Sequence, residues 1–207
     1  MPARRVIVIG ASAGGIEALV RLFRGVPSDI PASVLIALHV APTAKSLLAQ
    51  IIDHAASLQV SEAVHGEPLL PSRAYVAPPD RHLLVRDGAM CLSHGPRENH
   101  QRPAIDALFR SAARAYGPAT VGVVLSGTLD DGTAGLVTIA EAGGVTVVQS
   151  PDDAQFTGMP CAAIRGARVD HVVPASEMGA LLDSIVRQPQ GLTARPATAA
   201  ARKANRR

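Results

Sequence analysis

Apolar runs and amphipathic stretches alternate along most of the chain. The short runs, rich in Val, Ile and Leu, are continuous, which is typical of strands buried on both faces of a parallel sheet. The longer stretches between them have apolar residues three and four positions apart, which predicts helices. Strands are expected at 5–9, 33–38, 73–77, 82–85, 90–93, 120–125 and 145–149, and helices at 14–23, 45–55, 103–115, 133–142 and 175–187.

This order of elements predicts a single doubly wound α/β domain, with a mostly parallel sheet flanked by helices. The three short runs between residues 73 and 93 are separated by the turn signals Pro78-Pro79-Asp80 and Asp87-Gly88. They predict a short antiparallel β excursion in the middle of the domain. Pro103 is expected in the first turn of its helix, where the missing N–H costs little. No internal repeat or linker divides residues 1–188, which we assign to one domain.

The positive charge is concentrated at the carboxyl end. The whole chain has a net charge of +3, but residues 190–207 contain five basic residues and no acid, so the body is left at −2. Residues 189–207, rich in Ala, Thr and Pro, are expected to form a basic, disordered tail. The high pI therefore does not indicate nucleic-acid binding, and an aromatic content of 2% is too low for a surface that stacks bases.

Composition also disfavours membrane proteins, secreted proteins and metal proteins. No apolar run approaches the roughly 18 residues that span a bilayer, and the apolar run after Arg5 is too short for a secretory signal. Cys91 and Cys161 have no CxxC partner, as expected of reduced thiols in the cytoplasm. Five histidines show no metal-ligand spacing with one another: His54, His65, His82, His94 and His171.

Three predicted strands end in residues that could form a catalytic site. The first leads into Gly10-Ala11-Ser12-Ala13-Gly14, which satisfies the G-x-S-x-G pattern of a nucleophile on a sharp strand-to-helix turn. The second ends at His39, and the strand 120–125 leads into Asp130-Asp131-Gly132. Chemistry in open parallel sheets gathers beyond the carboxyl ends of the strands. We therefore expect Ser12 to attack a carbonyl carbon, His39 to move its proton and an aspartate to orient the histidine.

Each of these motifs alone has another interpretation. A glycine-rich turn after a strand more often binds a nucleotide phosphate, a histidine after a strand is usually structural, and Asp-Asp-Gly commonly caps a helix. A dinucleotide fingerprint would need glycine in place of Ser12 and an acid in place of His39. A nucleotide-binding module is thus a less favoured alternative to the hydrolase.

Taken in order, the motifs resemble the catalytic domain of the chemotaxis protein-glutamate methylesterases. The matching blocks are residues 6–15, 38–40, 74–82, 99–103 with 106 and 108–109, 122–127 with 131–132, and 158–160 with 163–164. The resemblance implies a triad of Ser12, His39 and Asp131, the last chosen over Asp130 because it directly precedes glycine. It implies hydrolysis of glutamate methyl esters on chemoreceptor-type signalling proteins, with deamidation of certain glutamines as a second activity. No metal or organic cofactor is implied.

The sequence departs from the family's pattern at several positions. Ala13 stands where the best-known members have threonine, and Gln101 stands where the family often has histidine. Thr128 and Leu129 replace the Met-Gly that the family commonly has before its aspartate. This altered loop motivates a second alternative, a catalytically lapsed adaptor that binds a signalling protein.

The oxyanion hole and the partners complete the expected picture. Backbone N–H groups at Ala13, Gly14 and Thr128 are expected to face the developing oxyanion. Family members usually carry an N-terminal receiver domain, whereas the first strand here begins within about five residues of Met1. We therefore expect constitutive activity or control by a separate receiver or regulatory protein. The expected substrate is a methylated receptor or signalling protein in the cytoplasm, without nucleic-acid binding or membrane insertion.

Overall fold

A seven-stranded parallel sheet forms the centre of the computed structural model, which describes residues 5–43 and 47–188. Its strands are β1 (Val6–Ala11), β2 (Ser33–Leu38), β3 (Gln59–Glu62), β4 (Arg73–Val76), β7 (Thr120–Val124), β8 (Val145–Gln149) and β9 (His171–Val173). They lie in the order β3-β4-β2-β1-β7-β8-β9, and every pairing between neighbours is parallel. A separate antiparallel hairpin consists of β5 (His82–Arg86) and β6 (Ala89–Ser93). The doubly wound α/β prediction, with its antiparallel excursion, is confirmed.

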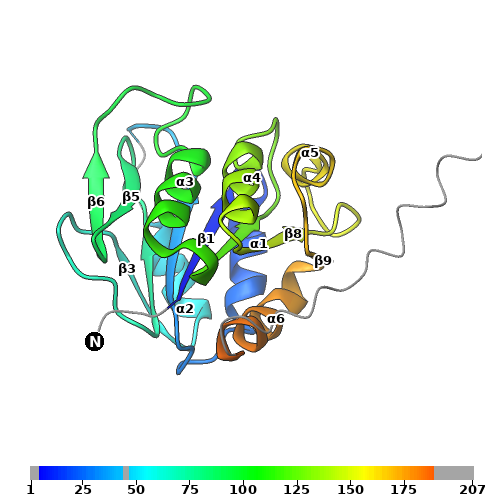
Figure 1. The fold of residues 1–207 in the computed structure, drawn as a ribbon, viewed down its shortest axis with the longest axis horizontal. Coiled ribbons are helices and arrows are strands. Elements are labelled where there is room, and N and C mark those ends of the chain that lie inside the picture. The colour runs from blue at the N-terminus through cyan, green and yellow to red at the C-terminus, as the bar shows by residue number, and fades with distance from the viewer. Residues whose placement is uncertain (1–4, 44–46, 189–207) are drawn as a thin grey trace, which may run out of the picture.

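Helices cover both faces of the sheet (Figure 1). They are α1 (Gly15–Phe23), α2 (Leu48–Ala55), α3 (Ile105–Tyr116), α4 (Thr133–Glu141), α5 (Gly158–Gly166) and α6 (Ala175–Arg187), with a short 3-10 turn at Gly117–Ala119. One core cluster joins the sheet to α1, α2 and α6, and a second joins it to α3, α4, α5 and the hairpin. Ile7 and Ile9 belong to the first cluster, Val6 and Val8 to the second. All six residues of β1 are buried, which explains why its apolar run is continuous.

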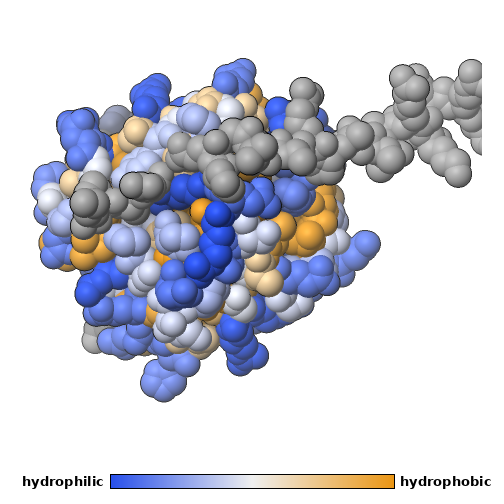
Figure 2. All heavy atoms as spheres, turned by 60° about the horizontal axis from the view of Figure 1, so that its bottom comes forward, coloured by the Kyte–Doolittle hydropathy of each residue, from blue (hydrophilic) through white to orange (hydrophobic). Residues whose placement is uncertain are grey.

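The surface carries both hydrophilic and hydrophobic side chains. On the face shown in Figure 2, hydrophilic side chains predominate and hydrophobic ones form small patches between them, as is usual for a protein surface. None of the helices in the described ranges is long and apolar enough to cross a membrane.

The structure corrects several details of the predicted elements. The run at 73–77 belongs to the main sheet as β4, so the excursion is only the β5–β6 hairpin. Pro103 is not in the first turn of a helix, because Ala104 is still extended (φ −105°, ψ 139°) and α3 begins at Ile105. The expected start of α2 at residue 45 and the expected tail at 189–207 lie outside the described residues. The short strands β3 and β9 and helix α5 were not predicted.

The strand order places three strand ends together. From β1 the chain moves to β2 and outward to the β3 edge, and it then returns to β7 on the other side of β1. This reversal makes the carboxyl edge of β1 a topological switch point, where ligands bind in open α/β sheets. The segments that follow β1, β2 and β7 contain Ser12, His39 and Asp131.

Candidate active site

Ser12 lies in a tight turn between β1 and α1. Its backbone N–H donates to the carbonyl oxygen of Ser126 at 2.9 Å, and its own carbonyl accepts from the N–H of Gly15 at 2.9 Å. Gly14 has φ 70°, and a Cβ atom there would lie 2.7 Å from Ser126 Oγ. Glycine is therefore required at this position of the turn, both for its conformation and for space.

The end of β7 packs directly against this turn. The Ser126 hydroxyl donates to the carbonyl oxygen of Ala13 at 2.8 Å and accepts from the N–H of Phe156 at 2.9 Å. Gly127 follows, and a Cβ atom there would lie 2.9 Å from the Cβ of Ser12. The segment after β7 can thus approach the serine so closely only because residue 127 has no side chain.

His39 connects the serine to an acidic side chain. Its backbone N–H donates to the carbonyl oxygen of Ala11 at 3.1 Å, which fixes its position beyond β2. Its Nδ1 lies 3.2 Å from Ser12 Oγ, and its Nε2 lies 2.8 Å from Asp131 Oδ2. With its proton on Nε2, the neutral imidazole donates to the carboxylate and leaves Nδ1 free to accept the serine proton.

The carboxylate of Asp131 is surrounded by hydrogen-bond donors. Its Oδ2 also accepts from the N–H of Ile105 at 2.9 Å, while Oδ1 accepts from Asn99 Nδ2 at 2.8 Å and from the N–H of Asp106 at 3.1 Å. Burial raises the pKa of Asp131, but the hydrogen bonds from His39, Ile105, Asn99 and Asp106 outweigh burial and leave this pKa below its ordinary value. The group is therefore an anion at neutral pH, facing the N-terminus of α3.

A second buried carboxyl group, Asp106, lies beside the first. Its Oδ1 accepts from the N–H groups of Gly132 at 3.0 Å and Gly135 at 2.7 Å, at the start of α4. Its Oδ2 accepts from the same Asn99 amide group at 2.9 Å, so that one side chain joins both carboxyl groups. Burial raises the pKa of Asp106, the hydrogen bond from Gly135 opposes this, and the negative charge of Asp131 raises it further, leaving it above its ordinary value.

Asn99 and Asp106 were not predicted as functional residues. The sequence points to them only through the block that runs from 99 to 103 and on to 106. Their contacts with Asp131 span 32 and 25 residues of the chain, so spacing along the sequence could not have shown them.

The raised pKa of Asp106 predicts a pH-dependent effect of Asp106→Asn on stability. The folded protein binds this proton more tightly than the unfolded chain, so wild type loses stability as pH rises through the folded-state pKa. The variant lacks this loss. We expect the free energy of unfolding of Asp106→Asn to increase relative to that of wild type as pH rises above about 4, the ordinary pKa of an aspartate. Urea unfolding across this range measures the difference.

Asp152→Asn, at an exposed turn, is the matched control for removing one carboxyl group from the surface. A difference between Asp106→Asn and wild type that stays constant with pH, or that shrinks as pH rises, would contradict the prediction.

The expected triad opens into a cavity of about 240 Å³. The cavity is lined by Ser12, His39, Asn99, His100, Gln101, Thr128, Leu129, Asp130 and Asp131. Ala13 and Gly14 lie in the turn after Ser12 but do not line this cavity. Leu129 is 72% exposed at its rim and has φ 64°, a conformation that favours glycine. Within the described part of the chain, no cluster of three or more His, Cys, Asp or Glu residues is arranged to hold a metal ion.

A doubly wound α/β domain with serine, histidine and aspartate in hydrogen-bond contact at its switch point has the architecture of a serine hydrolase. Comparison with known proteins identifies the family. A family model described as CheB methylesterase matches residues 7–182, and the chain belongs to this family. The resemblance found in the sequence is thereby confirmed.

Individual relatives agree with this assignment. The chain is 43% identical over 178 residues to the Protein-glutamate methylesterase/protein-glutamine glutaminase 1 of Geobacter metallireducens, covering 84% of this chain and 49% of that protein. It is 40% identical over 182 residues to a protein of the same name, numbered 2, of Anaeromyxobacter dehalogenans, covering 88% and 53%. The crystal structure of the Thermotoga maritima CheB methylesterase catalytic domain matches with a TM-score of 0.84 and 31% identity, covering 88% of this chain and 98% of that one. The chain thus spans about half the length of the curated relatives but nearly all of an isolated catalytic domain.

Proposed function

We propose that this protein hydrolyses glutamate methyl esters on a signalling protein of chemoreceptor type, with Ser12, His39 and Asp131 as its catalytic triad. The observation that carries the proposal is the continuous chain of hydrogen bonds from Ser12 Oγ through His39 to the ionised Asp131. Membership of the methylesterase family supports the choice of substrate. We also infer that the protein works in the cytoplasm, as its sequence predicts.

The first half of the reaction forms an acyl-enzyme. Ser12 Oγ attacks the ester carbon while His39 Nδ1 takes the hydroxyl proton, and the tetrahedral intermediate places a negative charge on the former carbonyl oxygen. Asp131 stabilises the resulting imidazolium, and its four hydrogen bonds hold it in place without rearrangement. The intermediate collapses, the C–O bond to the methoxy group breaks, and His39 returns the proton to give methanol.

The second half releases the glutamate. A water molecule attacks the acyl carbon as His39 Nδ1 takes one of its protons, and collapse of this intermediate returns the proton to Ser12. A glutamine side chain would follow the same course with ammonia as leaving group, which accounts for the glutaminase activity in the names of the relatives.

The oxyanion hole is assigned to the backbone around Ser12 and Thr128. Within the described residues, the N–H groups of Ala13, Gly14 and Thr128 donate to no backbone or side-chain acceptor, and of the three residues Thr128 is the one that lines the catalytic cavity. Ala13 and Gly14 also precede helix α1, whose N-terminus favours negative charge.

A fluorophosphonate probe tests the proposal directly. Such probes label a serine only when a neighbouring base activates it, so we expect an adduct on Ser12 that is lost in His39→Ala. Peptide mass mapping identifies the labelled residue, and the exposed Ser176→Ala variant should label like wild type. A folded wild-type protein that takes up no label would overturn the triad and favour the adaptor alternative. Calorimetry with NAD and ATP tests the nucleotide alternative.

Control by a separate receiver or regulatory protein stays a prediction. The rate of ester hydrolysis, measured with and without a phosphorylated receiver protein from the same signalling system, would test it. An unchanged rate with every such receiver would exclude control in trans.

A further inference from the structure

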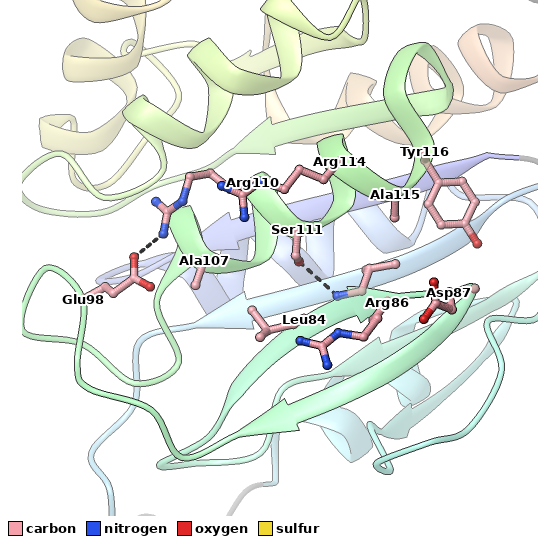
Figure 3. Close-up of a pocket in the computed structure, with 12 residues that line it drawn as sticks. Leu84, Arg86, Asp87, Glu98, Ala107, Arg110, Ser111, Arg114, Ala115 and Tyr116 are labelled. Carbon is pink, nitrogen blue, oxygen red and sulfur yellow. Dashed lines mark hydrogen bonds and ion pairs between the residues drawn. The ribbon is translucent and has the colours of Figure 1, made fainter.

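A larger cavity, of about 600 Å³, lies between helix α3 and the β5–β6 hairpin (Figure 3). We call it the α3 groove and define it by Arg86, Glu98, Arg110, Arg114 and Tyr116, which all line it. Its two walls are joined by a hydrogen bond from the N–H of Val85 in β5 to Ser111 Oγ in α3, at 3.0 Å. This hydrogen bond holds the two walls of the groove in a fixed position. The volume of the groove lies within the range of natural ligand sites.

The groove carries uncompensated positive charge. Arg110 and Arg114 are four residues apart on α3 and so share one face of the helix, and Arg86 faces them from the hairpin (Figure 3). Arg110 is paired with Glu98. Neither Arg86 nor Arg114 forms an ion pair within residues 5–43 and 47–188. Among the described residues, Asp87 is the only other acid that lines the groove.

The groove begins beside the candidate active site. Glu98 lines the groove, and the next residue, Asn99, lines the catalytic cavity and binds Asp131. Helix α3 also links the two sites. The N–H of its first residue, Ile105, donates to Asp131 in the catalytic site, and its later residues Arg110 and Arg114 line the groove. At about 1.5 Å per residue, Arg114 lies about 13 Å further along the helix axis than Ile105. The α3 groove thus leads away from the catalytic cavity along one side of α3.

We propose that the α3 groove binds an acidic segment of the protein substrate while a neighbouring side chain occupies the catalytic cavity. The inference rests on the proposed function, in which the substrate is a protein that carries glutamate side chains. Guanidinium groups bind carboxylates through paired hydrogen bonds, and Arg86 and Arg114 have no carboxylate partner within the described part of the chain. The apolar side chains of Leu84 and Ala107 in the lining would contact the stems of the bound residues.

The site favours a chain segment over a small anion, because two guanidinium groups without an ion pair in the described residues line a groove of about 600 Å³ that begins beside the catalytic cavity. The protein's own basic segment, residues 190–207, does not suit it, since that segment contains no acid. Contacts of this kind determine specificity and the rate of association more than they determine affinity.

Binding of a defined acidic peptide tests the proposal. The probe is a fluorescein-labelled peptide of alternating glutamate and alanine, and its partner is the same peptide with glutamine in place of glutamate. Fluorescence anisotropy should show that wild type binds the glutamate peptide and that its affinity falls as the salt concentration increases. The affinity of wild type for the glutamine peptide should be much lower. The double variant Arg86→Ala/Arg114→Ala should lower the affinity about tenfold, as expected for the loss of two partly exposed charge contacts.

A charge-matched control separates the groove from the general charge of the protein. Arg24→Ala/Arg165→Ala removes two exposed arginines at the ends of α1 and α5, and it should bind the glutamate peptide like wild type. Equal affinity of the two double variants, or no binding by wild type, would overturn the proposal.

Hydrolysis of p-nitrophenyl acetate, measured in parallel, distinguishes the failure of this inference from the failure of the proposed function. This small ester reaches the catalytic cavity without the groove, so wild type and Arg86→Ala/Arg114→Ala should hydrolyse it equally. If neither wild type nor the double variant hydrolyses the ester, but the double variant still binds the glutamate peptide more weakly than wild type, the proposed function fails and the α3 groove stands as an acidic-peptide site. If hydrolysis is equal and peptide binding is unchanged, only the groove is rejected.

Discussion

Ser12→Ala is expected to lower kcat for methyl ester hydrolysis by about 10⁵-fold or more, the size of loss seen when a triad serine is removed. The hydroxyl is the only group at this position that can form the acyl-enzyme, and no other described hydroxyl lies in contact with His39. Methanol release from a purified methylated receptor, or hydrolysis of p-nitrophenyl acetate where that substrate is lacking, measures the effect.

The same substitution should leave the free energy of unfolding within about 0.5 kcal/mol of wild type. The Ser12 side chain is only half-buried and makes a single hydrogen bond, to His39 at 3.2 Å, whereas the turn is held by backbone contacts that alanine retains. Ser176→Ala, at an exposed position of α6, is the control for removing a hydroxyl elsewhere. Activity of Ser12→Ala near that of wild type would rule out the mechanism. If the variant lost both activity and stability, unfolding would explain the lost activity, and the result would not support a catalytic role of Ser12.

The fold could be predicted because its central strands are unusually clear in the sequence. β1, β2, β7 and β8 are buried along their whole length, so each is a continuous apolar run that only a doubly covered parallel sheet explains. The missed elements lack such a signal. β9 has three residues, and β3 has a single buried residue, Val60.

Helix α5 was missed because its composition argues against a helix. The segment Gly158–Gly166 contains glycine at both ends and Pro160 near its start. Its position is decided by packing instead. The N–H of Met159 donates to the carbonyl oxygen of Gly127 at 2.9 Å, and the side chains of Met159 and Ala163 are buried in the core. Such tertiary contacts outweigh local propensity and cannot be read from the sequence.

The candidate site could be predicted only in part, because some of its residues are brought together by tertiary contacts rather than by the order of the strands. Ser12, His39 and Asp131 follow strands, and strand order alone brings their segments together. Asn99 precedes α3 in a loop, and its role as the link between Asp106 and Asp131 depends on side-chain geometry. The sequence itself shows that Thr128 and Leu129 depart from the family's pattern. The consequence of this departure, an exposed leucine with φ 64° at the rim of the cavity, appears only in the structure.

Asp131→Asn is expected to lower kcat by about 10⁴-fold, as in triads where the aspartate becomes asparagine. The wild-type carboxylate accepts from four donors, but an asparagine side chain has only one oxygen. If its NH2 group faces His39, the imidazole must keep its proton on Nδ1, and that nitrogen can no longer accept the proton of Ser12. If the NH2 group faces Asn99 instead, it meets a second NH2 group and the N–H of Asp106.

Either orientation leaves buried donors unpaired, so this variant should also be less stable than wild type by about 1–3 kcal/mol. Steady-state kinetics should show the loss in kcat rather than in KM, because Asp131 is only 3% exposed and its carboxylate is engaged with His39, through which it acts. Asp130→Asn is the matched control, since Asp130 is exposed on the same loop and does not contact His39. Only the aspartate that fixes the imidazole tautomer should show a large loss of kcat when it becomes asparagine. A large loss in Asp130→Asn with near-normal kcat in Asp131→Asn would therefore mean that the wrong aspartate has been assigned.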